Sequence, residues 1–194
     1  TPEFIEQFII RIEKGFESLR QQLEKVKPEA LIVVGDDGGM IFDHVQQPQF
    51  CLIVTDKFEG TTAFPGLGED LGSSNVTIKC HEELGLFLLE ELVVQEGFGI
   101  SQSRKVYQID DPKRGTANAF VHPVQKLIPN LDIPIVPLYV NCYASPTPTG
   151  HRCFQLGQAI AKILEEWPGN VAIYGAGGLS CDPFGRRAGW IDKP

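Results

Sequence analysis

The chain has 194 residues, of which 42% are hydrophobic and 22% are charged, and it carries a net charge of −8. This length and composition are typical of one globular domain and exclude a wholly disordered chain, a coiled coil and a collagen-like repeat. The negative charge gives no general attraction for phosphate backbones or anionic lipid, so we expect neither nucleic acid nor a membrane as a partner.

The inventory of cysteines and histidines is small. The chain has five cysteines and no CxxC pair, which excludes a disulfide framework and indicates mostly buried thiols in a reducing compartment. The first residues lack the basic region and cleavage site of a signal peptide, so we expect a cytoplasmic protein. Only four histidines, at positions 44, 81, 122 and 151, are available for metal or acid–base chemistry.

The first predicted element is a helix that ends before Pro28. Its apolar residues recur every three or four positions: Phe4, Ile5, Phe8, Ile9, Ile12, Phe16, Leu19, Leu23 and Val26. Residues 30–34 are a continuous apolar run, which predicts a strand covered on both faces. The polar turn GDDGG (35–39) follows this strand.

The middle of the chain predicts a strand over 50–54, then a surface loop over 56–74, which is rich in Gly, Thr and Ser. A helix is predicted over 81–94, with His81 at its start in a local hydrogen bond. A short strand is predicted within 98–102, a polar loop over 108–117 and a helix over 119–127.

The last part of the chain predicts a strand over 133–141, whose prolines indicate strand ends or a sheet edge. A helix over 151–166 and a strand over 171–175 follow. Strands that alternate with helices predict an α/β fold, with a central, mostly parallel or mixed sheet and helices on both faces. We expect a single domain over 1–194 that is incomplete at both ends.

Three segments of the predicted fold carry the informative residues. The first is GDDGG (35–39), the second surrounds Asn118 and Ala119, and the third is GGLSC (177–181), which continues to Arg186 and Arg187. Sites in open α/β sheets form at the carboxyl ends of strands. We therefore expect functional residues to lie in these segments.

These segments, with Arg152-Cys153-Phe154 and Leu156-Gly157 between the last two, resemble the class III extradiol ring-cleavage dioxygenases. That family opens protocatechuate, gallate and dihydroxyphenylpropionate-type catechols, and the resemblance covers nearly the whole chain. It implies a catecholic aromatic acid as substrate and Fe(II) held by two histidines and a carboxylate. It also implies separate acid–base histidines, and an oligomer of identical chains or with a catalytic paralogue.

Three histidine positions of that family hold other residues in this chain. Gly38 stands where the resemblance implies a metal histidine, and it offers no ligand. Asn118 and Cys181 stand at the two acid–base positions, and an asparagine can hydrogen-bond but cannot shuttle a proton near neutral pH. The other metal histidine and the carboxylate are expected outside the given sequence. The resemblance therefore implies that Gly38, Asn118 and Cys181 converge on one cleft at the strand ends.

Two functions stay open from the sequence. The chain is either an Fe(II)-dependent ring-cleavage dioxygenase with an impaired site or a non-catalytic structural or regulatory relative. Among the other candidates, His44 is a displaced metal ligand or, as we favour, a lone surface histidine. His122 lies four residues after Asn118 and is either a substitute acid–base group or a helix-surface histidine.

The remaining candidates are charged or thiol side chains. Arg186 and Arg187 suit a substrate carboxylate, or else a subunit interface or surface loop. Asp36 and Asp37 bind a divalent ion or, as we favour, cap the turn after the strand. Cys181 as a reactive thiol has no histidine partner evident in the sequence.

Overall fold

The computed structural model describes residues 2–36, 41–42, 46–61, 75–106, 118–142 and 144–177. Within them a five-stranded sheet has the order β5 (Ser101–Ser103), β2 (Phe50–Ile53), β6 (Ile135–Val140), β1 (Ala30–Gly35) and β7 (Val171–Ala176). β1 pairs in parallel with β6 and β7, and β2 in parallel with β5. β2 and β6 are antiparallel, so the sheet is mixed, as the sequence predicts.

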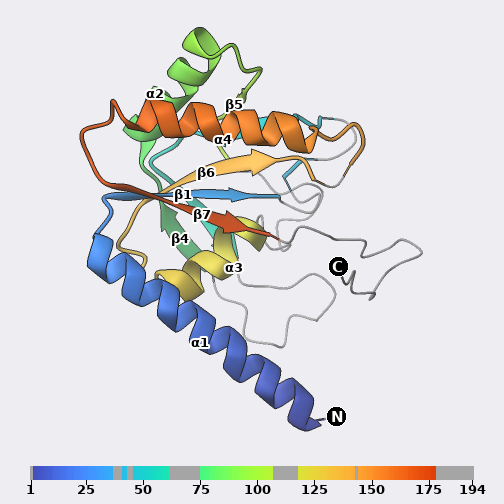
Figure 1. The fold of residues 1–194 in the computed structure, drawn as a ribbon, viewed down its shortest axis with the longest axis vertical. Coiled ribbons are helices and arrows are strands. Elements are labelled where there is room, and N and C mark those ends of the chain that lie inside the picture. Colours follow the sequence, from blue (N-terminus) through green and yellow to red (C-terminus); the bar gives the residue numbers. More distant parts are fainter. Residues whose placement is uncertain are drawn as a thin grey trace.

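Helices cover both faces of this sheet (Figure 1). α1 (Pro2–Val26) and α3 (Asn118–Leu127) lie on one face. α4 (Gly150–Leu164) lies on the other face with α2 (Glu82–Glu90), which continues as the π-helical turn η2 (Glu91–Gln95). None of the helices described here has the length and apolarity needed to cross a lipid bilayer.

The residues of β1 alternate between two hydrophobic clusters, one on each face. Leu31 and Val33 belong to the cluster beneath α3, whereas Ala30 and Ile32 belong to the cluster beneath α2 and α4. All four side chains are at most 1% exposed. A strand buried on both faces needs no polar alternation, which explains the continuous apolar run at 30–34.

A second, two-stranded sheet corrects the predicted loop over 56–74. β3 (Lys57–Thr61) and β4 (Asn75–Lys79) form an antiparallel pair in which Phe58 lies opposite Ile78. These two side chains are buried against the cluster beneath α3. The apolar residue of β3 alternates with Lys57 and Glu59, which is the pattern of a half-buried strand; the rest of the predicted loop lies outside the described residues.

β6 lies in the middle of the sheet. The prediction that its prolines mark strand ends or a sheet edge is therefore wrong for Pro137, which lies inside β6. Pro137 pairs with Val33 of β1. The ladder between β6 and β2 runs from Val140 to Leu138 and does not reach Pro137. A proline has no N–H to donate, and its position just outside the β2 ladder makes that loss tolerable. Pro134 precedes β6, as a strand-end proline should, and its carbonyl accepts a hydrogen bond from the Leu31 N–H.

His81 begins α2 as the sequence predicts. Its Nδ1 atom accepts a hydrogen bond of 3.2 Å from the Leu84 N–H, which satisfies one of the unpaired amides of the first helical turn. Thr149 has the same role at α4, where its Oγ1 accepts from the Arg152 N–H at 3.2 Å. Both helices therefore begin where polar side chains can cap them.

Candidate functional site

The carboxyl ends of β1, β6 and β7 meet at one edge of the sheet. Gly35, the last residue of β1, pairs with Tyr139 on one side and with Ala176 on the other. Because these three strands are parallel, the segments that follow them leave the sheet at the same edge. This is the edge at which the sequence predicts a site.

Gly35 allows β1, β7 and the start of α3 to approach one another closely. A Cβ atom built on Gly35 would lie 2.5 Å from Ala119 Cβ and 3.1 Å from the Ala176 carbonyl oxygen. Real Cβ contacts are not that short, so only glycine fits there. Ala119 adjoins Asn118 in the chain, and Gly35 and Ala176 lie shortly before Gly38 and Cys181.

Most predicted site residues lie outside the described part of the chain: Gly38, His44, Asp37, Cys181, Arg186 and Arg187. Asn118 is described only as the first residue of α3. Gly35, Ala119 and Ala176, which lie one to five residues from Gly38, Asn118 and Cys181, come together. The convergence of Gly38, Asn118 and Cys181 themselves remains a prediction.

His122 lies one turn along α3 from Asn118, as its spacing predicts. Its ring is half-buried, and burial lowers the pKa of the imidazole. A lowered pKa keeps the ring neutral near pH 7, which is the form that accepts a proton. Burial thus keeps His122 neutral but also makes it a weaker base, and its place in the site stays a prediction.

Sequence reasoning missed a buried polar network at the same edge. Tyr139 is fully buried, and its hydroxyl accepts a 2.9 Å hydrogen bond from Gln47 Nε2. Asn141 is 1% exposed, and its side chain accepts from the Ala144 N–H at 3.1 Å and donates to the Ala144 carbonyl at 2.7 Å. The same Gln47 nitrogen lies 3.4 Å from Asn141 Oδ1.

This network fixes two connections where the site is expected. Gln47 precedes β2, while Asn141 and Ala144 belong to the connection between β6 and α4. The Phe42 ring packs against Tyr139 with 4.7 Å between ring centroids. The sequence held one sign of this network, because Asn141 directly follows the apolar run of β6. A polar residue at the end of a strand commonly faces a site or closes a turn.

The four described cysteines are free thiols. Burial raises the pKa of Cys51 and of Cys80 to about 12, so neither is a thiolate nucleophile near pH 7. The prediction of buried thiols is correct for these two and wrong for Cys142, which is exposed after β6. Its pKa is also raised, first by partial burial and then by the nearby Asp36 carboxylate.

Gly38, the one metal position that the resemblance places within this sequence, has no side-chain donor and so does not fit a ferrous ion. Asn118 and Cys181 stand at the acid–base positions, and an asparagine cannot carry a proton near neutral pH. The described ranges hold no group of three or more His, Cys, Asp or Glu suited to a metal. We therefore derive no chemical step through iron.

Comparison with known proteins assigns the chain to a family. A family model described as the catalytic LigB subunit of aromatic ring-opening dioxygenase matches residues 6–191. The chain belongs to this family. The resemblance to the extradiol ring-cleavage dioxygenases is thereby confirmed, and the α/β fold with its mixed sheet and two helical layers agrees with it.

Two named relatives of this LigB-family chain are bacterial. A 2,3-dihydroxyphenylpropionate/2,3-dihydroxicinnamic acid 1,2-dioxygenase of Photorhabdus laumondii is 27% identical over 183 residues, which cover 94% of this chain and 51% of the relative. The protein of the same name from Escherichia coli strain K12 is 28% identical over 167 residues, covering 86% and 48%. The chain thus spans about half the length of the curated relatives it matches.

A solved structure supports the fold. The crystal structure of an uncharacterized protein from Escherichia coli K12 matches with a TM-score of 0.54 and 15% sequence identity, and it covers 93% of this chain and 57% of the other. At that identity the match concerns the arrangement of helices and strands alone.

Proposed function

We propose that this chain has the fold of an Fe(II)-dependent extradiol dioxygenase for catecholic aromatic acids, and that its own active site is impaired. The observation that supports this most is the contact of Gly35 with Ala119 and Ala176. It brings together residues that lie one to five positions along the chain from the three positions where the family resemblance expects histidines. The residues at those positions, Gly38, Asn118 and Cys181, supply neither the metal ligand nor the proton carriers.

The proposed ligand is a catechol with a carboxylate side group. The relatives named for 2,3-dihydroxyphenylpropionate support a phenylpropionate-type acid, and protocatechuate and gallate share its catechol and carboxylate. In this proposal Asn118 hydrogen-bonds a ring hydroxyl without moving its proton. Arg186 and Arg187 bind the carboxylate, for which paired guanidinium N–H groups are suited.

A second candidate function follows from the same three positions. A chain that keeps the fold but lacks the histidines can act as a structural or regulatory subunit beside a catalytic paralogue. The proposed oligomer is then a mixed one, whereas an enzyme of low activity would form an oligomer of identical chains. The two candidates differ in whether the chain alone consumes O₂.

Iron content and O₂ uptake of the purified full-length protein separate these two candidates, because two of the implied metal ligands are expected outside the given sequence. We expect little bound iron and no O₂ uptake with 2,3-dihydroxyphenylpropionate, protocatechuate or gallate, even after anaerobic loading with Fe(II). Stoichiometric iron together with O₂ uptake on one of these acids would overturn the impaired site. Calorimetric titration with the same acids measures binding separately from turnover, and binding without uptake would support the dioxygenase fold with an impaired site.

A further inference from the structure

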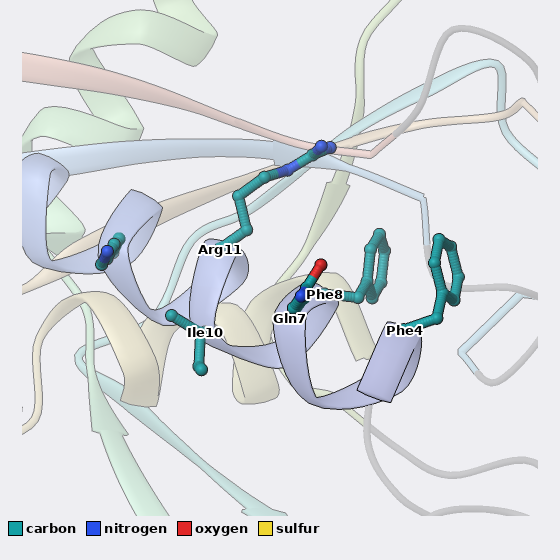
Figure 2. Close-up of a pocket in the computed structure, with 6 residues that line it drawn as sticks. Phe4, Gln7, Phe8, Ile10 and Arg11 are labelled. Carbon is teal, nitrogen blue, oxygen red and sulfur yellow. The ribbon is translucent and has the colours of Figure 1, made fainter. Parts of the chain in front are cut away.

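One side of α1 exposes a continuous apolar surface, which we call the free stripe. It consists of residues four or seven positions apart: Phe4 (68% exposed), Phe8 (49%), Ile12 (45%), Leu19 (37%) and Val26 (52%). This spacing places them on one side of a helix along its whole length. The Phe4 and Phe8 rings stack with 6.4 Å between centroids, and Figure 2 shows both rings on the same side of α1 as Arg11.

The free stripe is not the side of α1 that the rest of the domain holds. Phe16 and Leu23 pack against the hydrophobic cluster beneath α3. Beside them, Arg20 Nη1 donates a 2.7 Å hydrogen bond to the Lys126 carbonyl of α3. The C-terminal half of α1 therefore contacts its own domain on one side and presents the neighbouring side outward. In the N-terminal half, Ile5 (59% exposed) and Ile9 (50%) widen the exposed apolar surface on the side of Phe16 and Leu23. A contiguous exposed apolar surface of this kind marks an interaction site.

Charges on α1 are separated into two rows. The acidic row consists of five glutamates spaced three, four or seven residues apart: Glu3, Glu6, Glu13, Glu17 and Glu24. Arg20, which donates to the Lys126 carbonyl of α3, lies in the same row, so this row borders α3. Its Glu17 is already paired with Arg20 at 2.7 Å. The second row, on the outer border of the free stripe, contains no carboxylate: Gln7, Arg11, Lys14, Ser18, Gln21 and Lys25.

The outer border is thus basic on a chain whose net charge is −8. The Arg11 guanidinium lies 6.0 Å from the centroid of the Phe8 ring, so the positive charge directly adjoins the apolar surface. A partner that covers the free stripe must place its own border beside Arg11, Lys14 and Lys25. Carboxylates on that border would be attracted, and ammonium or guanidinium groups would be repelled.

We propose that the free stripe and its basic border bind an amphipathic helix of another protein, with Asp or Glu along one edge of its apolar face. This interaction is independent of the proposed ring-cleavage chemistry. Helix-against-helix packing is the expected mode because the stripe has the spacing that knobs-into-holes packing uses.

A second copy of α1 fits this surface less well. In an antiparallel pair, like borders of two helices face each other, which would oppose Arg11 and Lys14 of one copy to the same residues of the other. In a parallel pair the basic border of one copy faces the opposite border of the second copy's free stripe, which is the side where Phe16 and Leu23 pack against its own domain. The charges therefore favour a different protein over self-association.

The test uses two synthetic amphipathic helices of about 20 residues, long enough to form helix on binding. Both have leucine on the apolar face; one has glutamate and the other lysine along the edges. Fluorescence anisotropy with the 194-residue chain measures their affinities at low and high salt. We expect the glutamate peptide to bind about tenfold tighter or more, with the difference shrinking as salt rises.

An exposed apolar residue of another helix supplies the control. Ile12, on the free stripe, is 45% exposed, and Leu86 of α2, on the other face of the sheet, is 39% exposed. Ile12→Glu should remove binding and Leu86→Glu should leave it unchanged, with helicity by circular dichroism equal in both. The double change Arg11→Glu with Lys14→Glu should reverse the peptide preference.

Several results would overturn the proposal. They are equal affinity for the two peptides, no binding of either, or equal loss of binding in the Ile12→Glu and Leu86→Glu variants. Light scattering measures the oligomeric state of the chain and so tests whether a second copy occupies the free stripe. A dimer of the chain that Ile12→Glu dissociates would assign the surface to a second copy and would also contradict the proposal.

Discussion

Gly35 and Ala119 are in closer contact than any side chain at position 35 would allow. A Cβ atom on Gly35 would come within 2.5 Å of Ala119 Cβ, although the two residues are far apart in the chain. The contact joins the end of β1 to the start of α3, and Ala176 of β7 completes it. The geometry of the candidate site depends on this junction.

Substitution of Gly35 by alanine should therefore destabilise the protein. The added methyl group must displace α3 or β7, and overpacking of this kind lowers the free energy of unfolding by about 1–3 kcal/mol. Gly85 is the matched control, because a Cβ there would lie at an ordinary 3.6 Å from Val54. Gly85→Ala, within α2, should be neutral or stabilising by up to about 1 kcal/mol. Urea unfolding compares the two variants, and equal effects would argue against the junction.

The buried Asn141 should be needed for stability in a way that an exposed asparagine is not. Its removal leaves the Ala144 N–H and carbonyl without the partners they have now, and unsatisfied buried groups reduce stability by about 1–3 kcal/mol. Asn141→Ala should show this loss in denaturant unfolding, whereas Asn130→Ala, in the exposed turn after α3, should stay within about 0.5 kcal/mol of the parent. A loss no larger than that of Asn130→Ala would contradict the role of the network.

His122 should make the fold sensitive to mild acid. Burial lowers the pKa of its imidazole in the folded state, so the unfolded chain binds a proton more readily. The stabilising contribution is present above the unfolded pKa of about 6.5 and is lost as the pH falls from there through the folded pKa. His122→Gln should therefore reduce the drop in Tm between about pH 7.5 and about pH 5.5. His151→Gln, at an exposed position of α4, should leave that drop unchanged, and a change equal to that of His122→Gln would rule out this assignment.

Thiol reactivity should follow burial. With a pKa of about 12, Cys51 and Cys80 are almost wholly protonated at neutral pH, and their side chains are shielded from reagents. Cys142 is exposed and should react with a disulfide reagent in the native state. Cys142→Ser should remove one rapidly reacting thiol, and Cys51→Ser should remove none. Rapid reaction of Cys51 in the folded protein would show that β2 is more accessible than its burial indicates.

The sequence predicted best those elements whose pattern reflects their own burial. The run at 30–34 and the periodicity of α3 and α4 correspond to β1 and to helices packed on one side. The prediction for Pro137 was wrong because the preference of proline for sheet edges is a local rule. It cannot show that the ladder between β2 and β6 stops just before Pro137. The free stripe of α1 shows a related limit, since apolar periodicity predicts a helix but not what covers it.

The candidate site could be predicted only as far as the family resemblance reaches. It identifies Gly38, Asn118 and Cys181 by position, and the structure describes their neighbours Gly35, Ala119 and Ala176. The hydrogen bond between Gln47 and Tyr139 joins residues 92 positions apart. No local pattern encodes a pairing at that separation, so this part of the edge had to come from the fold.

The convergence of positions 38, 118 and 181 is the central claim, and metal binding by a histidine variant tests it most directly. The triple change Gly38→His, Asn118→His, Cys181→His places one imidazole at the implied metal position and one at each acid–base position, and imidazoles that converge on one cleft bind divalent metals together. The control variant has three histidines at separated exposed positions: Gln21→His, Glu90→His and Ser101→His. Titration with Co²⁺, followed by visible absorbance and calorimetry, should give one tight site in the first variant and only weak binding in the control. Equally weak binding by both variants would contradict the convergence.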